Sequence, residues 1–271
     1  MPGLPNYSNE LSGEKARAVS MLNLEGLSKH FGGVKALDQL DIKIEKGEIF
    51  GLIGPNGSGK STTVNLICGV YPATRGRIIF QNEEITNKPP HQQLRSGIAR
   101  TFQNIRIFEN MTVWQNLWVA QNSKEDVARQ NPLARWFGSS TAVREEIEKI
   151  LEFSHLAEKS NEPAGSLAFG EQRRLELARA VATKPTLLLL DEPAAGMNLE
   201  EVEELDERIR NLRDSGITIL LVEHVMELVM GVTDRMAVLN FGQKIAEGTP
   251  TEIQSDPKVQ EAYLGTSNES A

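Results

Sequence analysis

Residues 54–62 read Gly54-Pro55-Asn56-Gly57-Ser58-Gly59-Lys60-Ser61-Thr62. This run matches the pattern G-x-x-x-x-G-K-[ST] in full. It follows the apolar run Ile49-Phe50-Gly51-Leu52-Ile53, which we expect to be a buried strand, and it precedes a helix expected over residues 60–67. Glycines let the backbone bend so that successive N–H groups point inward, and the start of a helix adds a positive end. The stretch therefore predicts a phosphate-binding loop after a strand rather than an ordinary glycine turn.

The last residues of this loop carry its chemistry. Lys60 is expected to reach the β- and γ-phosphates of a nucleotide. Ser61 supplies a hydroxyl oxygen for Mg²⁺, a hard cation that prefers oxygen ligands and keeps several waters. The loop thus predicts ATP and Mg²⁺ as the bound groups.

Two carboxylates stand at the end of a second apolar run, Leu187-Leu-Leu-Leu-Asp191-Glu192. Carboxylates beside a buried strand are costly unless one meets a metal and the other accepts a proton. We expect Asp191 to hold Mg²⁺ through its water shell and Glu192 to polarise the attacking water. His224 follows another expected strand, over residues 217–222, and is predicted to contact the γ-phosphate and to keep Glu192 and the water aligned. A histidine alone is more often structural, so its position at a strand end carries this prediction.

The order of the expected elements predicts an α/β fold. Apolar spacing begins at Met21, and strands alternate with helices, which indicates a mainly parallel sheet with the phosphate loop beyond the carboxyl end of a central strand. Residues 89–156 show helical periodicity, with a low-apolar interruption at 122–131 that we expect to be a loop, and they predict a helical lobe inserted into the first. An acidic helix is expected from Glu200, with its apolar face formed by Val202, Leu205 and Ile209.

Composition limits the class of protein. The 271 residues carry 37 acidic and 29 basic side chains, a formal charge of −8, which disfavours general binding to nucleic acid. No run approaches the roughly 18 to 20 apolar residues that span a bilayer, so the chain is not expected to form the membrane pore itself. Residues 1–20 are predicted to be a flexible leader without the apolar core of a secretory signal. Cys68, the only cysteine, excludes an internal disulfide and is expected to pack as a small hydrophobe.

Taken together, these residues resemble the ABC ATPases over about residues 21–265. Further elements stand in the family's order. Phe31 resembles the aromatic residue that stacks on adenine, and Gln103 in Thr101-Phe-Gln-Asn resembles the Q-loop glutamine. His224 resembles the switch histidine. Residues 167–174, Leu-Ala-Phe-Gly-Glu-Gln-Arg-Arg, resemble the signature L-S-G-G-Q-Q-x-R and precede a helix expected over 171–182.

The resemblance implies a fold and a set of site residues. The fold is a cassette with a mainly parallel core sheet, an antiparallel β subdomain and a helical subdomain inserted at about 89–182, followed by a tail at 266–271. Glu192 and His224 would be catalytic. The metal ligands implied are Ser61, Gln103 and Asp191. The nucleotide contacts implied are Phe31, the nine residues Gly54 to Thr62, Gln103, Ala168, Phe169, Gly170 and Glu171.

In this family the signature of one subunit closes over the ATP held by the phosphate loop of another, so the resemblance implies a dimer. The helix after the signature would offer free N–H groups and a positive end to the partner's γ-phosphate. Three positions depart from the usual pattern. Ala168 lacks the serine hydroxyl that bonds the phosphate, Glu171 replaces a glutamine, and Asn198 stands where an aspartate is usual. Either closure is weaker, or the partner chain carries the better signature.

Within the family, four phrases resemble the ATPases of bacterial branched-chain amino acid importers, closest to the G-type ATPase. They are 31–37 Phe-Gly-Gly-Val-Lys-Ala-Leu, 99–108 Ala-Arg-Thr-Phe-Gln-Asn-Ile-Arg-Ile-Phe, 191–198 Asp-Glu-Pro-Ala-Ala-Gly-Met-Asn and 261–265 Glu-Ala-Tyr-Leu-Gly. This implies a peripheral position on the cytoplasmic face of the inner membrane. The partners implied are a second ATPase, identical or related, two permease subunits and, indirectly, a periplasmic binding protein.

Several alternatives stay open at this point. Urea and amide importers share these phrases, and lipopolysaccharide exporters fit them less well. ABC ATPases of translation or DNA repair are disfavoured because the interval from 60 to 167 is too short for a coiled coil and the chain has a single cassette. The lobe carries apolar residues that form either a groove for the permease or the core of the lobe: Ile105, Ile107, Phe108, Met111, Trp114 and Trp118.

Overall fold

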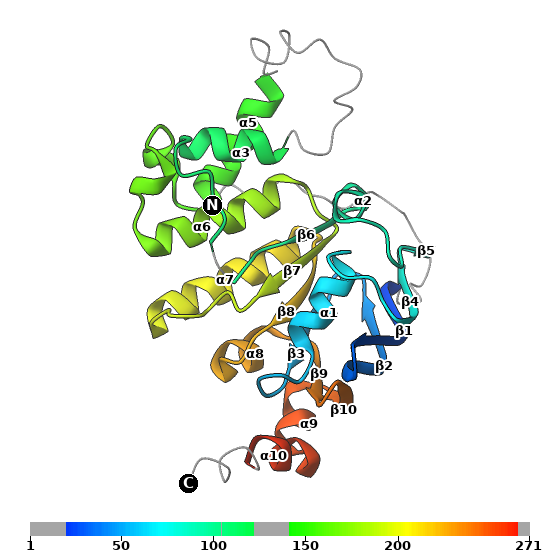
Figure 1. Cartoon of the computed structure of the whole chain (residues 1–271). Helices are drawn as coiled ribbons and strands as arrows, with labels where there is room; N and C mark the ends of the chain where they lie inside the picture. The colour runs from blue at the N-terminus through cyan, green and yellow to red at the C-terminus, as the bar shows by residue number, and fades with distance from the viewer. Residues whose placement is uncertain (1–19, 104, 122–140, 265–271) are drawn as a thin grey trace, which may run out of the picture.

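The computed structural model describes residues 20–103, 105–121 and 141–264 (Figure 1). The predicted tail at 266–271 and the predicted interruption at 122–131 lie outside this part. The predicted leader also lies outside it except for Ser20, where the first strand begins. The division into subdomains remains a prediction.

The core of the molecule is a six-stranded sheet in the order β10-β9-β3-β8-β7-β6. The strands from β6 to β9 are parallel to their neighbours, and only β10 is antiparallel. Every residue of β3, β7 and β8 is buried, as expected of parallel strands covered on both faces. The strands are β3 (Ile49–Ile53), β6 (Ile98–Arg100), β7 (Leu187–Asp191), β8 (Thr218–Val222), β9 (Arg235–Asn240) and β10 (Gln243–Gly248). Since β3 lies inside this sheet and precedes residue 54, the prediction of a loop beyond a central strand is confirmed.

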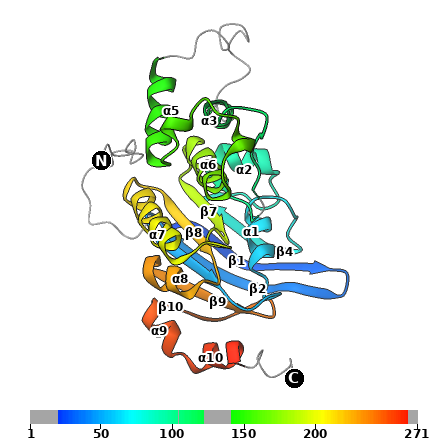
Figure 2. The same ribbon diagram turned by 90° about the vertical axis from the view of Figure 1, so that its left-hand side faces the viewer.

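A second, antiparallel sheet has the order β2-β1-β4-β5. Its strands are β1 (Ser20–Phe31), β2 (Val34–Glu45), β4 (Arg75–Phe80) and β5 (Glu83–Glu84). Figure 2 shows β1 and β2 as a long two-stranded ribbon that projects from one side of the molecule. The combination of a parallel sheet, an antiparallel sheet and helices confirms the predicted α/β class.

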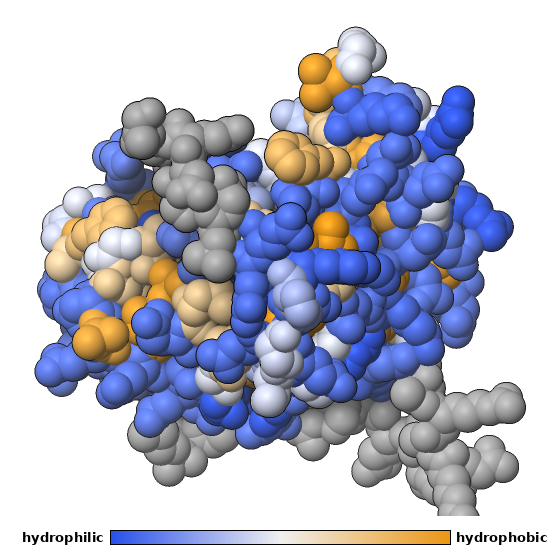
Figure 3. Space-filling model, turned by 90° about the horizontal axis from the view of Figure 1, so that it is seen from below, coloured by the Kyte–Doolittle hydropathy of each residue, from blue (hydrophilic) through white to orange (hydrophobic). Residues whose placement is uncertain are grey.

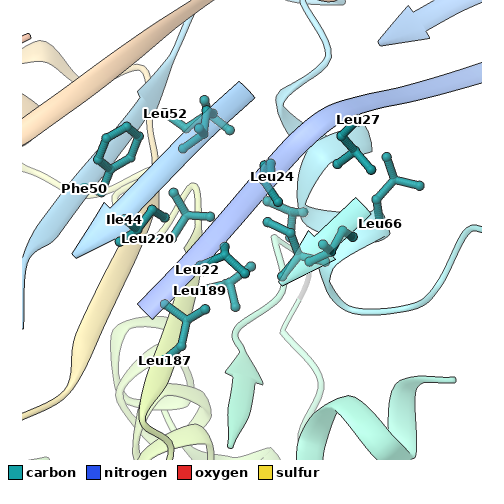
Figure 4. Close-up of a cluster of buried hydrophobic side chains, with 14 of the residues drawn as sticks. Leu22, Leu24, Leu27, Ile44, Phe50, Leu52, Leu66, Leu187, Leu189 and Leu220 are labelled. Carbon is teal, nitrogen blue, oxygen red and sulfur yellow. The ribbon is translucent and has the colours of Figure 1, made fainter. Parts of the chain in front are cut away.

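The two sheets enclose the largest group of buried side chains, together with helix α1 (Lys60–Ile67). In Figure 4 side chains from β1, β2, β3, α1, β7 and β8 gather in one space: Leu22, Leu24, Leu27, Ile44, Phe50, Leu52, Leu66, Leu187, Leu189 and Leu220. Cys68 packs against this group, and burial raises the pKa of its thiol to about 11, so the predicted packing role of Cys68 is confirmed. This core fixes β3 and α1, the two elements that hold the glycine loop.

Helices α7 (Leu199–Asp214) and α8 (Met226–Val232) form a second apolar cluster with the sheet. Val202, Leu205 and Ile209 are buried, which confirms the predicted inner face of the acidic helix. Asn198 is the N-cap of α7, and its side chain accepts a hydrogen bond of 3.0 Å from the N–H of Glu201. An asparagine at this position therefore has a local structural reason.

A helical lobe lies above the sheet in Figure 1. It contains α3 (Val113–Gln121), α5 (Thr141–Phe153), two 3₁₀ turns (Ala157–Lys159 and Ala164–Ser166) and part of α6 (Phe169–Ala182). Trp114 and Trp118 stack with their ring centroids 6.5 Å apart and pack against the buried cluster of this lobe, which favours the core interpretation for these two residues. Helix α6 contributes side chains to two clusters, Leu175 and Ala178 to the lobe and Leu177 and Val181 to the sheet.

The interval predicted as helical from residue 89 also contains a strand. After α2 (Pro90–Ser96), β6 joins the parallel sheet beside β7, with Ile98 paired to Leu187. A strand of three residues has no alternation that a sequence pattern can reveal. In the sequence, the apolar residues Ile98 and Ala99, which are buried in the structure, are equally compatible with a helix.

The described part of the chain ends in two short helices, α9 (Pro250–Ser255) and α10 (Pro257–Leu264). Figures 1 and 2 place them at the end of the molecule opposite the helical lobe. They pack on β9 and β10 through a fourth apolar cluster, in which Ile53, Val238, Ile253 and Val259 are buried.

Hydrophilic side chains predominate on the face seen in Figure 3, with apolar ones in limited groups between them. In the part of the chain that the structure describes, none of the helices combines the length and the apolar character needed to cross a bilayer.

Candidate nucleotide-binding and hydrolysis site

The glycine loop runs from the end of β3 to the start of α1, and its glycines are required by its geometry. Gly54 has a φ of +145°, and a Cβ at this position would lie 2.2 Å from the carbonyl oxygen of Leu239. Gly59 has a φ of +111°, and a Cβ there would lie 2.7 Å from Leu37 in β2. Any other residue at either position would therefore clash and strain the backbone. The loop is thus fixed between β9 and the antiparallel sheet.

The ammonium group of Lys60 lies inside the loop. Its Nζ donates hydrogen bonds to the carbonyl oxygens of Gly54, at 2.6 Å, and Pro55, at 3.0 Å. Burial lowers the pKa of Lys60, and this effect is opposed by three carboxylates, those of Glu192, Asp191 and Glu223. The loop therefore holds a positive charge that faces the acidic end of the sheet.

Asp191 ends β7 and is paired with a residue that the sequence analysis missed. Arg100 Nη2 lies 2.6 Å from Asp191 Oδ2, and Arg100 Nη1 donates a hydrogen bond of 2.6 Å to Asn65 Oδ1 in α1. Asp191 is only 5% exposed, so an unpaired charge there would be costly. Arg100 thus ties β6, β7 and α1 together at the predicted metal carboxylate.

Three of the predicted residues meet beside Asp191. Gln103 Nε2 donates a hydrogen bond of 2.7 Å to Glu192 Oε2, and His224 Nδ1 lies 4.0 Å from Glu192 Oε1. Glu192 has a φ of +50°, an uncommon value for a residue with a side chain, and its N–H donates to the carbonyl of Val222 at 2.8 Å. The structure thus gathers the predicted base, the predicted switch histidine and the predicted Q-loop glutamine around one carboxylate.

Glu223, also missed from the sequence, holds two of these loops in place. Its side chain is fully buried. Oε1 accepts a hydrogen bond of 2.9 Å from the N–H of Ala194, and Oε2 accepts one of 2.6 Å from the N–H of His224 and one of 3.3 Å from that of Val225. One carboxylate therefore connects the turn after Glu192 to the start of the loop that carries His224. The sequence held a signal for Glu223, because this carboxylate directly follows an apolar strand. The same kind of position led to the prediction for Asp191.

Glu176 has a similar role on the other side of the site. This residue of α6 is buried, and its Oε1 accepts hydrogen bonds of 3.3 Å from the N–H groups of Phe102 and Arg106, which stand on either side of Gln103 in the chain. Burial raises the pKa of Glu176, and the two backbone N–H groups oppose that rise. The Q-loop segment is thus attached to the helix that follows the signature.

The signature residues lie at the start of α6. Ala168 is the N-cap, and Phe169 is 58% exposed. Glu171 accepts hydrogen bonds from the N–H of Ala168, at 3.0 Å, and from Lys159 Nζ, at 2.9 Å, and the Lys159 bond is the main cause of its lowered pKa. This cap gives a structural reason for a glutamate at 171. No hydrogen bond or ion pair joins residues 167–171 to residues 54–62, both fully described, so one chain does not bring these two sets together.

Phe31 ends β1 and is 44% exposed. Its ring meets that of Tyr71 edge to face at 5.4 Å, and the ammonium of Lys29 lies 4.8 Å from its centroid. Tyr71 was not among the predicted residues. The exposed part of the Phe31 ring is available for a nucleotide base to stack on.

The residues assigned to Mg²⁺ supply oxygen atoms of three kinds. Asp191 offers a carboxylate, Ser61 an exposed hydroxyl at the start of α1, and Gln103 an amide oxygen, since its nitrogen is bonded to Glu192. Among the residues that the structure describes there is no group of three His, Cys, Asp or Glu side chains suited to a metal. A few neutral oxygens with one carboxylate fit Mg²⁺, which retains waters and takes phosphate oxygens as ligands.

A cavity of about 720 Å³ lies between the helical lobe and the core, bordered by α2, β6, α3 and α6. Ile107 and Phe108 of the predicted groove line it, with Arg100, Phe102 and Glu176. Met111, Trp114 and Trp118 do not line it. Trp114 and Trp118 pack against the lobe core, as Ile107 also does, whereas Ile105 and Met111 belong to neither the cavity lining nor the lobe core.

Comparison with known proteins gives two family matches. The model described as ABC transporter matches residues 37–195, and the one described as Branched-chain amino acid ATP-binding cassette transporter matches residues 243–268. The chain is 43% identical over 252 residues to the high-affinity branched-chain amino acid transport ATP-binding protein BraF of Pseudomonas aeruginosa, covering 90% of this chain and 98% of that protein. It is also 43% identical over 249 residues to LivG of Escherichia coli, which bears the same description, with the same coverage.

Among solved structures, an ATP-binding cassette of an ABC transporter crystallised in its ADP conformation matches with a TM-score of 0.79 and 37% identity. The match covers 91% of this chain and 99% of that one.

Proposed function

Since the chain belongs to the ABC transporter family of ATP-binding subunits, in which ATP hydrolysis is coupled to transport, we propose that it powers the import of branched-chain or related amino acids. The observation that carries the ATPase activity is the placement of Gln103 and His224 around the Glu192 carboxylate, beside the Lys60 loop. The match of residues 243–268 to a branched-chain amino acid transporter model supports the substrate class.

In this proposal Glu192 is the base. Its Oε2 accepts from Gln103 and its Oε1 faces His224, so a water beside the carboxylate would be oriented toward the phosphate loop before reaction begins. Glu192 accepts the proton that the attacking water loses. His224 is exposed just after β8, with its Nδ1 3.3 Å from Glu223 Oε2, and its exposed ring would contact the γ-phosphate.

Lys60 and the helix α1 bind the phosphates. The Lys60 ammonium exchanges its two carbonyl partners for the β- and γ-oxygens of ATP, which removes competing bonds of 2.6 and 3.0 Å. Ser61, Gln103 and Asp191 would hold Mg²⁺, which neutralises charge on the phosphate oxygens when bound. Arg100 keeps the Asp191 carboxylate in a fixed orientation for this task.

A second ATPase subunit completes the site. The N-terminal turn of α6 has backbone N–H groups without helical partners, and no hydrogen bond or ion pair joins residues 167–171 to this chain's own phosphate loop. A partner's γ-phosphate would be bound there, without the serine hydroxyl that Ala168 lacks. We infer a dimer in which each nucleotide lies between two protomers.

The cavity beside Phe108 is where a permease would dock. Its walls come from both the lobe and the core, and Gln103 lies in the segment 101–108 that leads into it. Occupation of the cavity would therefore move the segment that contacts Glu192. The chain would lie on the cytoplasmic face of the membrane through this contact, with a periplasmic binding protein delivering the substrate to the permease.

The activity is tested by Glu192→Gln, with Glu203→Gln on the exposed face of α7 as the matched control. We expect the Glu192 variant to bind ATP and to lose nearly all turnover, while the Glu203 variant keeps both. Substantial hydrolysis by the Glu192 variant at saturating ATP would remove this residue from the role of base.

The transport role is tested by identifying the permease that co-purifies in mild detergent, followed by uptake of leucine and of urea into proteoliposomes. We expect ATP-dependent uptake of leucine. Phe108→Asp should prevent permease retention, and Met111→Asp, outside the cavity, should not. Uptake of urea alone would replace the proposed substrate class.

A further inference from the structure

The C-terminal segment lies against the phosphate loop, and neither the hydrolysis mechanism nor the transport role accounts for this contact. The segment contains the phrase Glu261-Ala-Tyr263-Leu-Gly and helices α9 and α10. Tyr263 packs against the apolar cluster that contains Val238, Ile253 and Val259. Ile53, the residue directly before Gly54, is a fully buried member of the same cluster. The ring of Tyr263 is therefore part of the support under the end of β3.

Strand β9, on which α9 and α10 pack, and the turn after it contact the loop at both ends. The carbonyl of Leu239 in β9 approaches Gly54 so closely that a Cβ there would lie 2.2 Å away. In the turn between β9 and β10, the N–H of Gly242 donates a hydrogen bond of 2.9 Å to the carbonyl of Ser58. Residues of β9 and the following turn therefore border the loop twice, at its first glycine, Gly54, and at Ser58, close to the start of α1.

The hydroxyl of Tyr263 is buried in this region. Burial raises the pKa of Tyr263, and a hydrogen bond from the backbone of Gly54 opposes that rise. A buried hydroxyl in an apolar cluster is costly unless it is bonded, so its position at Gly54 fixes the direction of the ring. The apolar packing and the polar contact thus act at the same point of the loop.

We propose that Tyr263 is a positioning residue for nucleotide binding, through which α10 supports Gly54, the first residue of the phosphate loop. The inference rests on the nucleotide site proposed above. Tyr263 touches no reacting atom. It fixes the backbone of Gly54, whose carbonyl also accepts from Lys60, and so reduces the ordering that nucleotide binding requires.

The test is Tyr263→Phe in the full chain, which removes one hydroxyl and keeps the ring in the cluster. Val259→Ala is the control, because Val259 lies on the same helix and in the same cluster but carries no polar group. Affinity for the fluorescent nucleotide MANT-ADP with Mg²⁺ and the melting temperature are measured for both variants and the parent chain. We expect Tyr263→Phe to weaken binding about threefold to tenfold, the range of one hydrogen bond. Val259→Ala should lower the melting temperature by several degrees and leave affinity within about twofold.

A spectroscopic readout separates positioning from packing. The chain has three tyrosines, so ¹³Cζ-labelled tyrosine gives few signals, and the one lost in Tyr263→Phe belongs to Tyr263. We expect this signal to shift when ADP is added. Equal affinity of Tyr263→Phe and the parent chain, with a signal that ADP does not move, would overturn the inference and leave Tyr263 as a packing residue. Failure of the parent chain to bind MANT-ADP would instead count against the nucleotide site itself.

Discussion

Replacement of Glu223 by glutamine tests whether one buried carboxylate sets the positions of Glu192 and His224. Glutamine has nearly the same volume but only one acceptor oxygen. If that oxygen stays on the N–H groups of His224 and Val225, the amide NH₂ faces the N–H of Ala194, which loses its bond of 2.9 Å. A hydrogen bond to a charged group contributes about 1.5–3 kcal/mol, and the two that remain become weaker without the charge. We therefore expect the free energy of unfolding to fall by about 2–4 kcal/mol.

The substitution Glu223→Gln should also lower the rate of ATP hydrolysis. Release of the Ala194 N–H frees the turn directly after Glu192, so the carboxylate samples positions away from Gln103. We expect kcat for ATP to fall about tenfold, equivalent to roughly 1.4 kcal/mol of the barrier, with KM little changed because the Lys60 loop is intact.

Urea unfolding and steady-state ATPase assays at 25 °C measure the two effects. Glu203→Gln, which removes the same charge from an exposed site on α7, serves as the control and should change neither quantity. A kcat within about twofold of the parent chain, alongside the expected loss of stability, would show that Glu223 supports the fold without positioning the base. An unchanged free energy of unfolding would contradict the three hydrogen bonds themselves.

Three further substitutions test neighbouring contacts. Arg100→Met leaves the buried Asp191 carboxylate without its partner and should cost about 3–5 kcal/mol in urea unfolding, whereas the double variant with Asp191→Asn should recover part of that loss. The pKa of Glu171 is lowered from 4.5, chiefly by Lys159, so its contribution to stability is present above that value and is lost as pH falls through the folded pKa. The melting temperatures of the parent chain and Glu171→Gln should therefore differ at pH 7 and converge as the pH falls through the folded pKa, which lies below 4.5. Glu176→Gln keeps an acceptor for both backbone N–H groups, so it should retain kcat in an ATPase assay, while Glu176→Ala should lose about 2–3 kcal/mol of stability and lower kcat.

The parts of the fold that the sequence predicted are those set by local chemistry. The helix after the glycine loop begins at Lys60 and ends at Ile67, as expected. The glycine motif and the apolar run before it leave few other positions at which this helix could begin. Helix α6 begins at Phe169, two residues before the expected start, because Ala168 is an unusual N-cap whose role depends on Glu171. Strand β6 was missed because three residues show no period.

The residues missed at the site share a different cause. Glu176 and Glu223 bond to backbone N–H groups, and any residue type supplies those, so no partner is visible in the sequence. Glu176 lies 74 residues from Phe102, and Arg100 lies 91 residues from Asp191. Such pairs become visible only when the order of the parallel strands is known. The positions of Lys60, Asp191 and Glu192 were predictable because Lys60 completes a glycine motif at the start of a helix and the two carboxylates stand at the end of an apolar strand.

Helix α6 belongs to two apolar clusters at once, one on each side of it. At 1.5 Å per residue its 14 residues form a stiff rod about 21 Å long. A rod packed along both flanks resists local bending, so we expect it to shift as a single body. Any force on its first turn then displaces Glu176 and the loop attached to it in the same instant, and the two ends of the helix cannot respond independently.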